Sequence, residues 1–388
     1  MELKEYAISD IASLKYGKML AKTKFTKTGY PVFSGYKVTG YTSEYLYEEP
    51  EVIVVARGVG GTGDVKMSPP KSWVTNLSIV LSVDTNLVDK FFFKEFLHAE
   101  NLKSKLDSGA SISQITINSL ESYKVKLPDI SFQQAVRDIL INYDTLIENN
   151  NRRIAILEYM AQSLYREWFV KFRYPGHEDN LDVDGNLKLV DSPLGQIPVD
   201  WEVKPLGELV EFKRKTIKKG TVSENTPYMG LEHFPRKSIA LSNWEEVSEI
   251  GSNKLAFSRG DILFGKIRPN FHKVGVAQVD GLCSSDTFVL SPKERTHHSL
   301  IAMVTFSNEF VAQAVQTAQG SKMPRASWDV LQEFAVCVPD SKVLESFNSF
   351  VTPAIEQIRV LSLKNRNLKL QRDMLLPKLI SGQIELRE

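Results

Sequence analysis

A heptad pattern of apolar residues occurs twice in this chain and limits the possible folds more than any other feature. Its positions alternate steps of four and three, which places them on one face of a long helix with a period of about 3.5 residues. Every position of the second copy lies 211 residues after its counterpart, as Phe347 does after Val136. The first copy consists of Val136, Leu140, Tyr143, Ile147, Asn150, Ile154, Leu157, Ala161, Leu164 and Trp168, and the second of Phe347, Val351, Ala354, Ile358, Leu361, Asn365, Leu368, Arg372, Leu375 and Leu379. The sequence therefore predicts two equivalent long helices in an internal repeat, each preceded by a globular module.

Composition sets only broad limits on function. The chain has 388 residues, enough for two or three domains, and 42% of them are hydrophobic, as in ordinary globular proteins. Its formal net charge is only +1, so any surface that binds a polyanion must be local. Cys283 and Cys337 form no CxxC pair, and we expect buried free thiols. Because no apolar run reaches transmembrane length and the start lacks a signal peptide, we expect a cytoplasmic protein.

The first module is expected over residues 1–129 and mixes strands with a helix. Glu51–Ala56, Leu77–Val83 and Tyr123–Leu127 are short runs rich in β-branched residues, which is typical of strands. Phe91–Leu106 has an apolar face with helical spacing. Strands followed by one helix and a further strand favour an α+β unit over a doubly wound sheet.

The second module is expected over residues 201–340 and repeats the first. Its entry, Leu206–Lys213, resembles Ile8–Lys15 at an offset of 198, whereas its end follows the first module at an offset of 211. Thirteen extra residues must therefore lie in its interior. Strands are expected at Ser258–Phe264 and Asp286–Leu290, and a helix at Leu300–Ala318.

The long helices and a linker account for the rest of the chain. The first helix is expected over 130–172, and the second helix with a C-terminal tail over 341–388. Between the first helix and the second module, residues 173–200 are polar and rich in turn residues, which predicts a linker with one small hairpin at Asp184-Gly185.

Motifs for catalysis or cofactor binding lack the context that they need. Gly58–Gly63 fits GxGxxG, but Ser68-Pro69-Pro70 follows, so no helix can begin there to bind a pyrophosphate, and a flexible turn near a ligand is the better interpretation. Glu202-Val-Lys204 could join Asp182, Asp184 or Asp191 in the acid-x-lysine pattern of metal-dependent nucleases, yet it lies at a linker boundary. His297-His298 has no metal-ligand spacing to acids or cysteines. We therefore predict no catalytic residue and no metal site in this chain.

Local positive charge is the strongest sign of a binding function. Between Ile11 and Gly40 there are six lysines and no acid, interleaved with aromatic residues, and the second module has basic clusters in corresponding places. Recurrence in both modules favours a surface that contacts a phosphate backbone, with arginine, serine or tyrosine side chains near base edges. The predicted DNA-binding residues are Lys18, Lys22, Lys24, Lys27, Tyr30, Ser34, Tyr36, Arg57 and Lys66 in the first module, and Lys213, Arg214, Lys215, Lys218, Lys219, Lys266, Arg268, His272, Lys273, Lys322 and Arg325 in the second.

The polar seam positions predict how the helices pair. The seam midpoints lie near residues 152 and 363, with Asn150 two residues before the first and Asn365 two residues after the second. An antiparallel pairing brings the two asparagines opposite each other, whereas a parallel pairing sets each against an aliphatic residue. A buried asparagine pair fixes the register of a coil at some cost in stability. We therefore predict an antiparallel coiled coil.

Three segments resemble the specificity subunit of type I restriction–modification systems. They are Ser192–Gly207 at the entry to the second module, Leu164–Phe169 near the end of the first helix, and Leu375–Gly382 at the end of the second. The resemblance spans the whole chain. It departs at the start, because the first module opens at Met1 without an Ile-Pro-x-x-Trp entry segment.

The resemblance implies a fold and a division of labour. It implies two target recognition domains, each for one half of a split DNA sequence, joined by two helices that form an antiparallel spacer with pseudo-two-fold symmetry. The resemblance also implies that two methyltransferase subunits bind the helices and that nuclease-translocase subunits join that complex. S-adenosylmethionine, ATP and Mg²⁺ are expected on these partners. The 32-residue rise of the seam is about 48 Å, or roughly one to one and a half turns of B-DNA between the half-sites.

Two other classes of function stay open from the sequence. A standalone nuclease would need metal-dependent cleavage that Glu202→Ala abolishes. A structural coiled-coil adaptor would show no salt-dependent DNA binding.

Overall fold

The computed structural model describes residues 3–35, 37–58, 61–107, 113–182, 184–320, 322–381 and 383–384. The chain divides into two compact units. Unit 1 comprises Met1–Thr145 and Lys369–Glu388, and unit 2 comprises Leu146–Leu368. Each unit thus contains one predicted module together with parts of both long helices.

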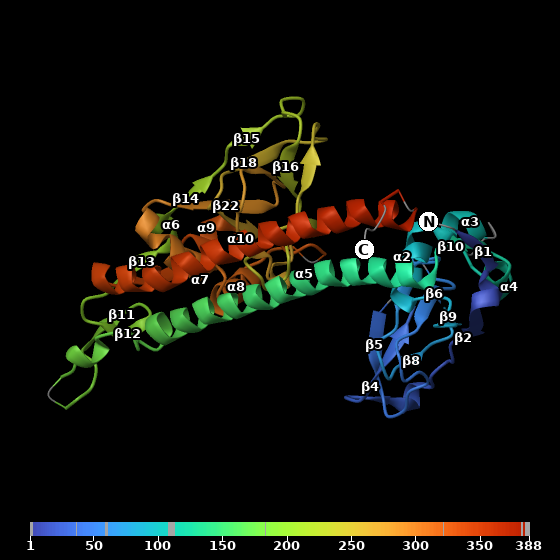
Figure 1. The fold of residues 1–388 in the computed structure, drawn as a ribbon. Helices are drawn as coiled ribbons and strands as arrows, with labels where there is room; N and C mark the ends of the chain where they lie inside the picture. The colour runs from blue at the N-terminus through green and yellow to red at the C-terminus, as the bar shows by residue number, and fades with distance from the viewer. Residues whose placement is uncertain are drawn as a thin grey trace. The chain divides into compact units, whose positions relative to one another are not determined.

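The two long helices pair antiparallel. They are α5 (Ile130–Tyr165), which continues into a π-helical turn η2 (Arg166–Val170), and α10 (Ser341–Ile380) (Figure 1). In unit 2 the Asn150 amide donates a hydrogen bond to Asn365 Oδ1 at 2.8 Å, and the Trp168 ring lies 5.8 Å from the Phe347 ring. Asn150 thus lies opposite Asn365, and Trp168 lies opposite Phe347. The two helices therefore run in opposite directions. The asparagines meet across the seam, as the antiparallel register requires.

In each unit, the core is completed by the end of the long helix that does not directly follow that unit's module in the sequence. In unit 1, Leu379 of α10 is only 2% exposed and packs in one cluster with Val136 and Leu140 of α5. In unit 2, Trp168 and Phe169 at the end of α5 pack with residues at the start of α10, such as Phe347. Unit 1 therefore depends on the C-terminal part of the chain.

Unit 1 is built from small, mostly antiparallel sheets. Its central sheet has the order β2-β9-β6-β7, and a second sheet has the order β3-β5-β4-β8, while β1 pairs with β10. The bounds are β1 (Lys4–Ala7), α1 (Ile8–Ile11), β2 (Ala12–Tyr16), η1 (Lys22–Lys24), β3 (Phe25–Thr26), β4 (Tyr30–Ser34), β5 (Lys37–Thr42), β6 (Val52–Val55), β7 (Val65–Met67), β8 (Trp73–Val74), β9 (Ser78–Val83), α2 (Lys90–Ala99), α3 (Leu102–Leu106), α4 (Ile117–Glu121) and β10 (Lys124–Leu127).

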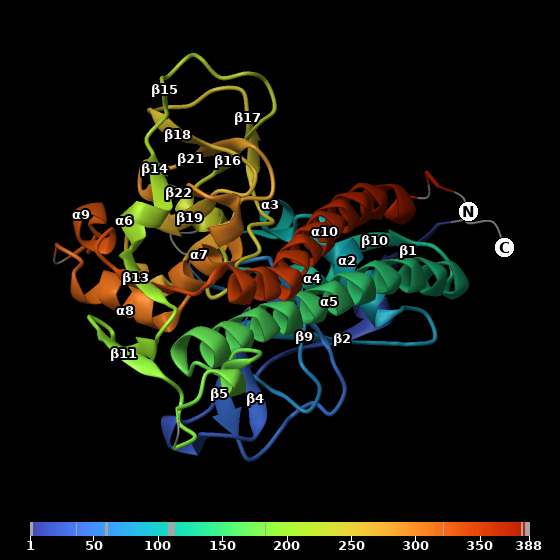
Figure 2. The ribbon, with the colours of Figure 1, turned by 90° about the vertical axis from the view of Figure 1, so that its left-hand side faces the viewer.

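Unit 2 repeats this plan within its described residues. Its central sheet has the order β14-β22-β19-β20, β13 pairs with β23, and a second sheet of order β15-β18-β21-β16-β17 extends beyond the central one (Figure 2). The bounds are η3 (His177–Asp179), β11 (Leu189–Ser192), β12 (Gly195–Pro198), β13 (Glu202–Pro205), α6 (Leu206–Leu209), β14 (Val210–Lys213), β15 (Thr216–Ile217), β16 (Thr226–Met229), η4 (Leu231–His233), β17 (Glu245–Val247), β18 (Lys254–Phe257), β19 (Ile262–Gly265), η5 (Pro269–Phe271), β20 (Val274–Val276), β21 (Gly281–Cys283), β22 (Thr287–Pro292), η6 (Arg295–His297), α7 (His298–Thr305), α8 (Asn308–Gln316), α9 (Trp328–Leu331) and β23 (Ala335–Val338).

Strand registers show that the repeat is exact at the level of single residue pairs. Lys4 pairs with Leu127 in unit 1, and Glu202 pairs with Val338 in unit 2, which reproduces the offsets of 198 and 211. In the central sheets Val52 pairs with Leu81, whereas Ile262 pairs with Leu290, at offsets of 210 and 209. The offset thus rises by twelve between β2 and β6. Most of the extra residues lie in the second sheet of unit 2 and its loops.

Several predicted elements are shorter than expected. The helix predicted over Phe91–Leu106 is two helices, because Asn101 adopts a left-handed conformation with φ of 50°. The helix predicted over Leu300–Ala318 divides into α7 and α8, because the Ser307 side chain caps a new helix by accepting from Phe310 N. The strand predicted from Ser258 begins only at Ile262, after a turn. The linker hairpin lies later in the chain than predicted, because β11 and β12 form it between Leu189 and Pro198. The predicted position, Asp184-Gly185, is flanked instead by an isolated bridge between Leu181 and Leu187.

The enlarged second module is fastened to both helices. Glu158 of α5 accepts hydrogen bonds from Ser238 Oγ at 2.6 Å and from Ile239 N at 2.8 Å. On α10, the Arg366 guanidinium lies 4.1 Å from the Trp244 ring centre and donates to Trp244 O at 3.1 Å. These contacts hold the second sheet of unit 2 against the helical pair.

Burial raises the pKa of Glu158, and the hydrogen bonds from Ser238 and the backbone only partly oppose that shift. A raised folded-state pKa means that the folded protein holds this proton more tightly than the unfolded chain, so stability from this group is lost as pH rises through the raised pKa. Glu158→Gln keeps both acceptor contacts and avoids the buried charge. We expect its unfolding free energy, relative to the parent, to be higher at pH 7 than at pH 4 in urea titrations. Glu158→Ala loses the hydrogen bonds and should be destabilised at both pH values by about 1 to 2 kcal/mol. A pH-independent difference between the Gln variant and the parent would contradict this assignment.

Candidate nucleic-acid interface

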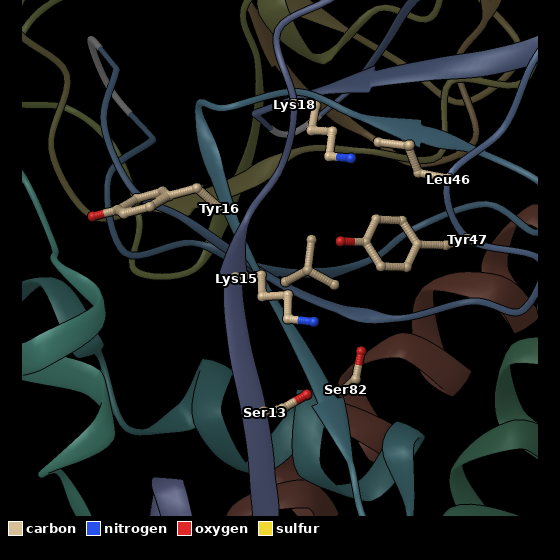
Figure 3. A pocket seen from close by; sticks show the side chains of 8 residues that line it. Ser13, Lys15, Tyr16, Lys18, Leu46, Tyr47 and Ser82 are labelled. Carbon is tan, nitrogen blue, oxygen red and sulfur yellow. The ribbon is translucent and has the colours of Figure 1, made fainter.

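A small polar cavity marks one face of the central sheet in unit 1. It has a volume of about 240 Å³ and is lined by side chains from β2, from β9 and from the loop after β5. Figure 3 shows the ammonium groups of Lys15 and Lys18 and the hydroxyl of Tyr47 directed into the hollow, whereas Tyr16 points away. Ser13 and Ser82 add hydroxyl groups at its edge. Cationic and hydroxyl groups on a small concave surface suit a phosphate or the polar edge of a base.

Strand periodicity explains why these side chains meet. On β2, Leu14 packs against the core whereas Ser13 and Lys15 point to the opposite face. Antiparallel pairing puts Ser13 beside Ser82 and Lys15 beside Val80. The Trp73 indole N–H donates to Lys18 O at 2.7 Å and so fixes the chain after β2. Burial raises the pKa of Tyr47, which keeps its hydroxyl protonated and able to donate.

Other predicted residues of the first module lie at the surface in various settings. Lys18, Lys22, Lys24, Lys27 and Arg57 are exposed, and Lys24 lies 3.4 Å from Glu44. Three others are half-buried: Tyr30 packs edge-on against Tyr45, Ser34 Oγ lies 3.0 Å from Thr75 Oγ1, and Lys66 is on β7. Tyr36 lies outside the described residues. Lys22, Lys24 and Lys27 fall in or near η1 and β3, outside the residues that line the cavity.

In unit 2, cations gather on a cluster of aromatic rings. The Arg214 guanidinium lies 4.5 Å from the Phe212 ring centre, and the Lys266 ammonium lies 4.9 Å from that of Phe288. Trp328 packs against both rings. Lys266 donates to Ser285 O at 2.7 Å, and burial lowers its pKa. Arg325, which lies 3.3 Å from Asp286, brings a third cation to this cluster.

Three predicted contact residues of the second module turn out to have internal partners. The Lys213 ammonium lies 2.8 Å from Asp261, which is 3% exposed, so this lysine forms a largely buried ion pair. His272 is 6% exposed, and its Nε2 lies 2.9 Å from Phe306 O. Because its ring is buried against Phe306, His272 is placed for packing rather than for the predicted DNA contact, and the same burial lowers its pKa. Lys273 donates to Leu231 O, and burial lowers its pKa.

The remaining predicted cations of unit 2 are exposed. They are Lys215, Lys218, Lys219, Arg268 and Lys322. Arg236 was not predicted, although its guanidinium stacks 4.0 Å from the Phe271 ring centre beside Arg268. Lys15 belongs to the basic cluster of the first module but was not in the list of predicted DNA-binding residues, and Tyr47 was not predicted. Lys15 could have been found from its alternation with Leu14, but Tyr47 comes from a distant loop that sequence spacing does not place.

The two charged residues of the acid-x-lysine motif pair with each other on a strand. Glu202 and Lys204 lie on β13, and their charged groups form an ion pair at 2.9 Å. Across the described ranges, no group of three or more His, Cys, Asp or Glu side chains is arranged to hold a metal ion. In the same ranges, no helix has the length and apolarity needed to cross a membrane.

These features define a class of protein, in which a duplicated α+β module is built onto an antiparallel helical pair. Residues 1–159 and 198–373 match the family described as the type I restriction modification DNA specificity domain. The chain belongs to this family of type I restriction–modification specificity subunits.

Named relatives agree with this assignment. The type I restriction enzyme MjaIX specificity subunit of Methanocaldococcus jannaschii is 24% identical over 312 residues, which cover 77% of this chain and 69% of the relative. The EcoDI specificity subunit of Escherichia coli is 22% identical over 360 residues, or 87% of this chain and 78% of the relative. The crystal structure of a type I restriction–modification S subunit from M. genitalium has the same fold, with a TM-score of 0.66 at 17% identity, covering 100% of this chain and 97% of that one.

The exposed cations of unit 2 give a direct test of DNA contact. Replacing Arg214, Lys215, Lys218 and Lys219 with glutamine should weaken binding to duplex DNA and make it less sensitive to salt. Each lost phosphate contact lowers the slope of log K against log salt by about 0.9, so the change should approach about 3.6 if all four contact phosphates. Fluorescence anisotropy at several salt concentrations measures this slope.

A matched control comes from lysines on α10. Neutralising Lys342, Lys364 and Lys369 in the same way should leave the slope unchanged. Lys213→Met should instead lower the unfolding free energy by about 2 to 4 kcal/mol, because it leaves the Asp261 charge buried without its partner. If the slope of log K against log salt is the same for the parent and for the variant with all four residues replaced, then Arg214, Lys215, Lys218 and Lys219 do not contact phosphates.

Proposed function

We propose that this chain selects the DNA target of a type I restriction–modification complex. Each module would contact one half of a bipartite sequence, and the helical pair would bind methyltransferase subunits. Methyl transfer and ATP-dependent cleavage would then be carried out by partner subunits, which would hold S-adenosylmethionine, ATP and Mg²⁺. Two methyltransferase subunits fit the internal two-fold repeat.

The main support for this proposal is that the two modules have the same strand pairs in the same register. The same residue pairs join β1 to β10 and β13 to β23, and the same helical seam supports both modules. The scaffold is therefore conserved between the halves, while the surface side chains differ. One half has a cavity with Lys15, Lys18 and Tyr47, whereas the other has cations stacked on Phe212 and Phe288. Equal scaffolds with unequal surfaces are suited to two different half-sites.

An apolar groove between the helices supports a binding site for a methyltransferase subunit. Within unit 2 it has a volume of about 520 Å³ and lies between α5 and α10. Ile156, Met160 and Phe350 line it and are 58%, 59% and 60% exposed. Large apolar side chains at such exposure are typical of a surface that another protein covers.

Mapping methylated adenines tests the proposal. The chain would be co-expressed with the neighbouring methyltransferase subunit, and methylation would be read across the host genome. We expect a two-part motif with a fixed gap. Replacing Arg268 and Arg325 with alanine should relax one part of the motif only, because both residues belong to the second module. A continuous motif, or the absence of any motif with an active methyltransferase, would contradict the proposal.

A further inference from the structure

A second, larger cavity lies in unit 2 between the second module and α10. Its volume is about 740 Å³, within the range of pockets that hold small ligands. The turn before β19, the residues after β20, the end of β22 and the middle of α10 form its walls. It is separate from the groove between α5 and α10, with which it shares no lining residue.

The cavity is rich in positive charge. Its lining includes five cationic side chains, against the two carboxylates of Asp261 and Glu356; the cations are Lys213, Arg259, Lys293, Arg295 and Arg359. Asp261 is engaged by Lys213, and Glu356 accepts from Arg359 at 2.9 Å while lying 3.4 Å from Arg259. Two carboxylates cannot balance five cations, so the cavity attracts an anion.

A buried amide on the wall gives a second, independent sign of a ligand. Gln278 is 4% exposed and lines the cavity, and its Oε1 has no hydrogen-bond partner within the described parts of the chain. A buried acceptor without a donor costs free energy, so such groups are normally satisfied. A phosphate of DNA offers no donor to this oxygen. A ligand that carries both a negative charge and an N–H donor would satisfy the arginines and Gln278 together.

The repeat shows that the scaffold does not require four of these five cations, whereas the fifth, Lys213, has Lys15 as its counterpart. The strand and helix registers place Glu49 at the position of Arg259, Asp84 at that of Lys293, Asn86 at that of Arg295, and Glu148 at that of Arg359. Pro69 stands where the second module has Gln278. The first module therefore keeps the same fold with acids or neutral residues there. Four of the five cations are therefore particular to the second module.

We propose that this cavity binds a phosphorylated small molecule of nucleotide size. Its phosphates contact Arg295, Arg259 and Arg359, and an amino group of its base donates to Gln278 Oε1. This binding site goes beyond DNA recognition and does not depend on the proposed DNA interface.

The test uses the purified full chain and radiolabelled ATP as the probe in equilibrium dialysis. We expect saturable binding of one ATP per chain, with competition by pyrophosphate. Arg295→Gln should weaken binding at least about tenfold, the expected loss for one charge-assisted hydrogen bond. Arg152→Gln, on the exposed face of α5, is the matched control and should bind ATP like the parent.

Gln278→Leu separates ligand binding from folding. This variant removes the unpaired oxygen, so its melting temperature without ligand should be equal to or above that of the parent, while its affinity for ATP falls. The proposal is overturned if ATP shows no saturable binding at millimolar concentration, or if Gln278→Leu and Arg295→Gln bind it as tightly as the parent. It is also overturned if duplex DNA of unrelated sequence displaces ATP competitively, because the cavity would then be a DNA-backbone contact.

Discussion

Replacing Phe350 or Met160 with glutamate should prevent this chain from forming a stable complex with its methyltransferase subunit. Both side chains are more than half exposed at the apolar groove, so the folded chain tolerates a charge there. Once a partner covers the groove, each carboxylate would be buried without a counter-charge. Loss of an apolar anchor alone costs about 2 kcal/mol or more at such sites, or roughly 30-fold in affinity for each substitution. Co-purification with a tagged methyltransferase subunit, followed by analytical ultracentrifugation, measures this effect.

The same variants should keep the DNA affinity of the isolated chain, since neither residue belongs to the predicted interface. Tyr159→Glu offers a comparison, because Tyr159 is 68% exposed on α5 but does not line the groove. We expect Tyr159→Glu to retain the complex. If all three variants purify with the methyltransferase subunit in the parental ratio, the groove is not the docking site.

The second large effect is expected from Leu379→Ala, which should destabilise the first module even though it lies near the end of the chain. Leu379 is 2% exposed in the core of unit 1, and truncation of a buried leucine costs about 2 to 5 kcal/mol. Deleting residues from 369 onward should leave that core unable to form. Hydrogen exchange of the β9 amides in unit 1, compared with the β22 amides in unit 2, reports which unit has lost protection.

Met374→Ala serves as the control for this prediction, because Met374 lies in the same part of α10 and is 65% exposed. Its effect should stay within about 0.5 kcal/mol. Trp168→Ala gives the reciprocal test, since Trp168 is the repeat equivalent of Leu379 and is buried in unit 2. If Leu379→Ala reduced hydrogen-exchange protection in unit 2 and left unit 1 unchanged, Leu379 would not be part of the core of unit 1.

Local patterns were sufficient to predict much of this fold. The heptad seam located α5 and α10 because seam residues follow a short period, and the asparagine positions gave the register of their pairing. The β-branched runs located β6 and β9. The helix break at Ser307 could have been found too, because Ser followed by Asn-Glu is a good helix start. The left-handed turn at Asn101 has no comparable local signal.

The candidate site was much less predictable, because it depends on which residues the loops bring together. His272 and Lys273 follow the exposed Arg268 in sequence, yet the left-handed conformations of Arg268 and His272 turn the chain so that the His272 ring enters the core. Lys213 looked like a surface cation until its buried partner Asp261, 48 residues away, was known. The cavity of unit 1 brings Lys15 of β2 together with Tyr47 from the loop after β5, and sequence spacing does not encode this arrangement.

The dependence of unit 1 on Leu379 sets the order in which the protein can mature on the ribosome. Unit 2 is a continuous stretch, so all its residues have been synthesised before position 369 is translated. The first module leaves the ribosome first but must wait for the last part of α10. Closing a loop from Val136 to Leu379 in an unstructured chain would be slow, but α5 and α10 are already paired in unit 2, so the remaining turns can form by extension of that pair. Translation that stops before α10 is complete would therefore release a chain with a finished second module and an exposed, unfinished first one.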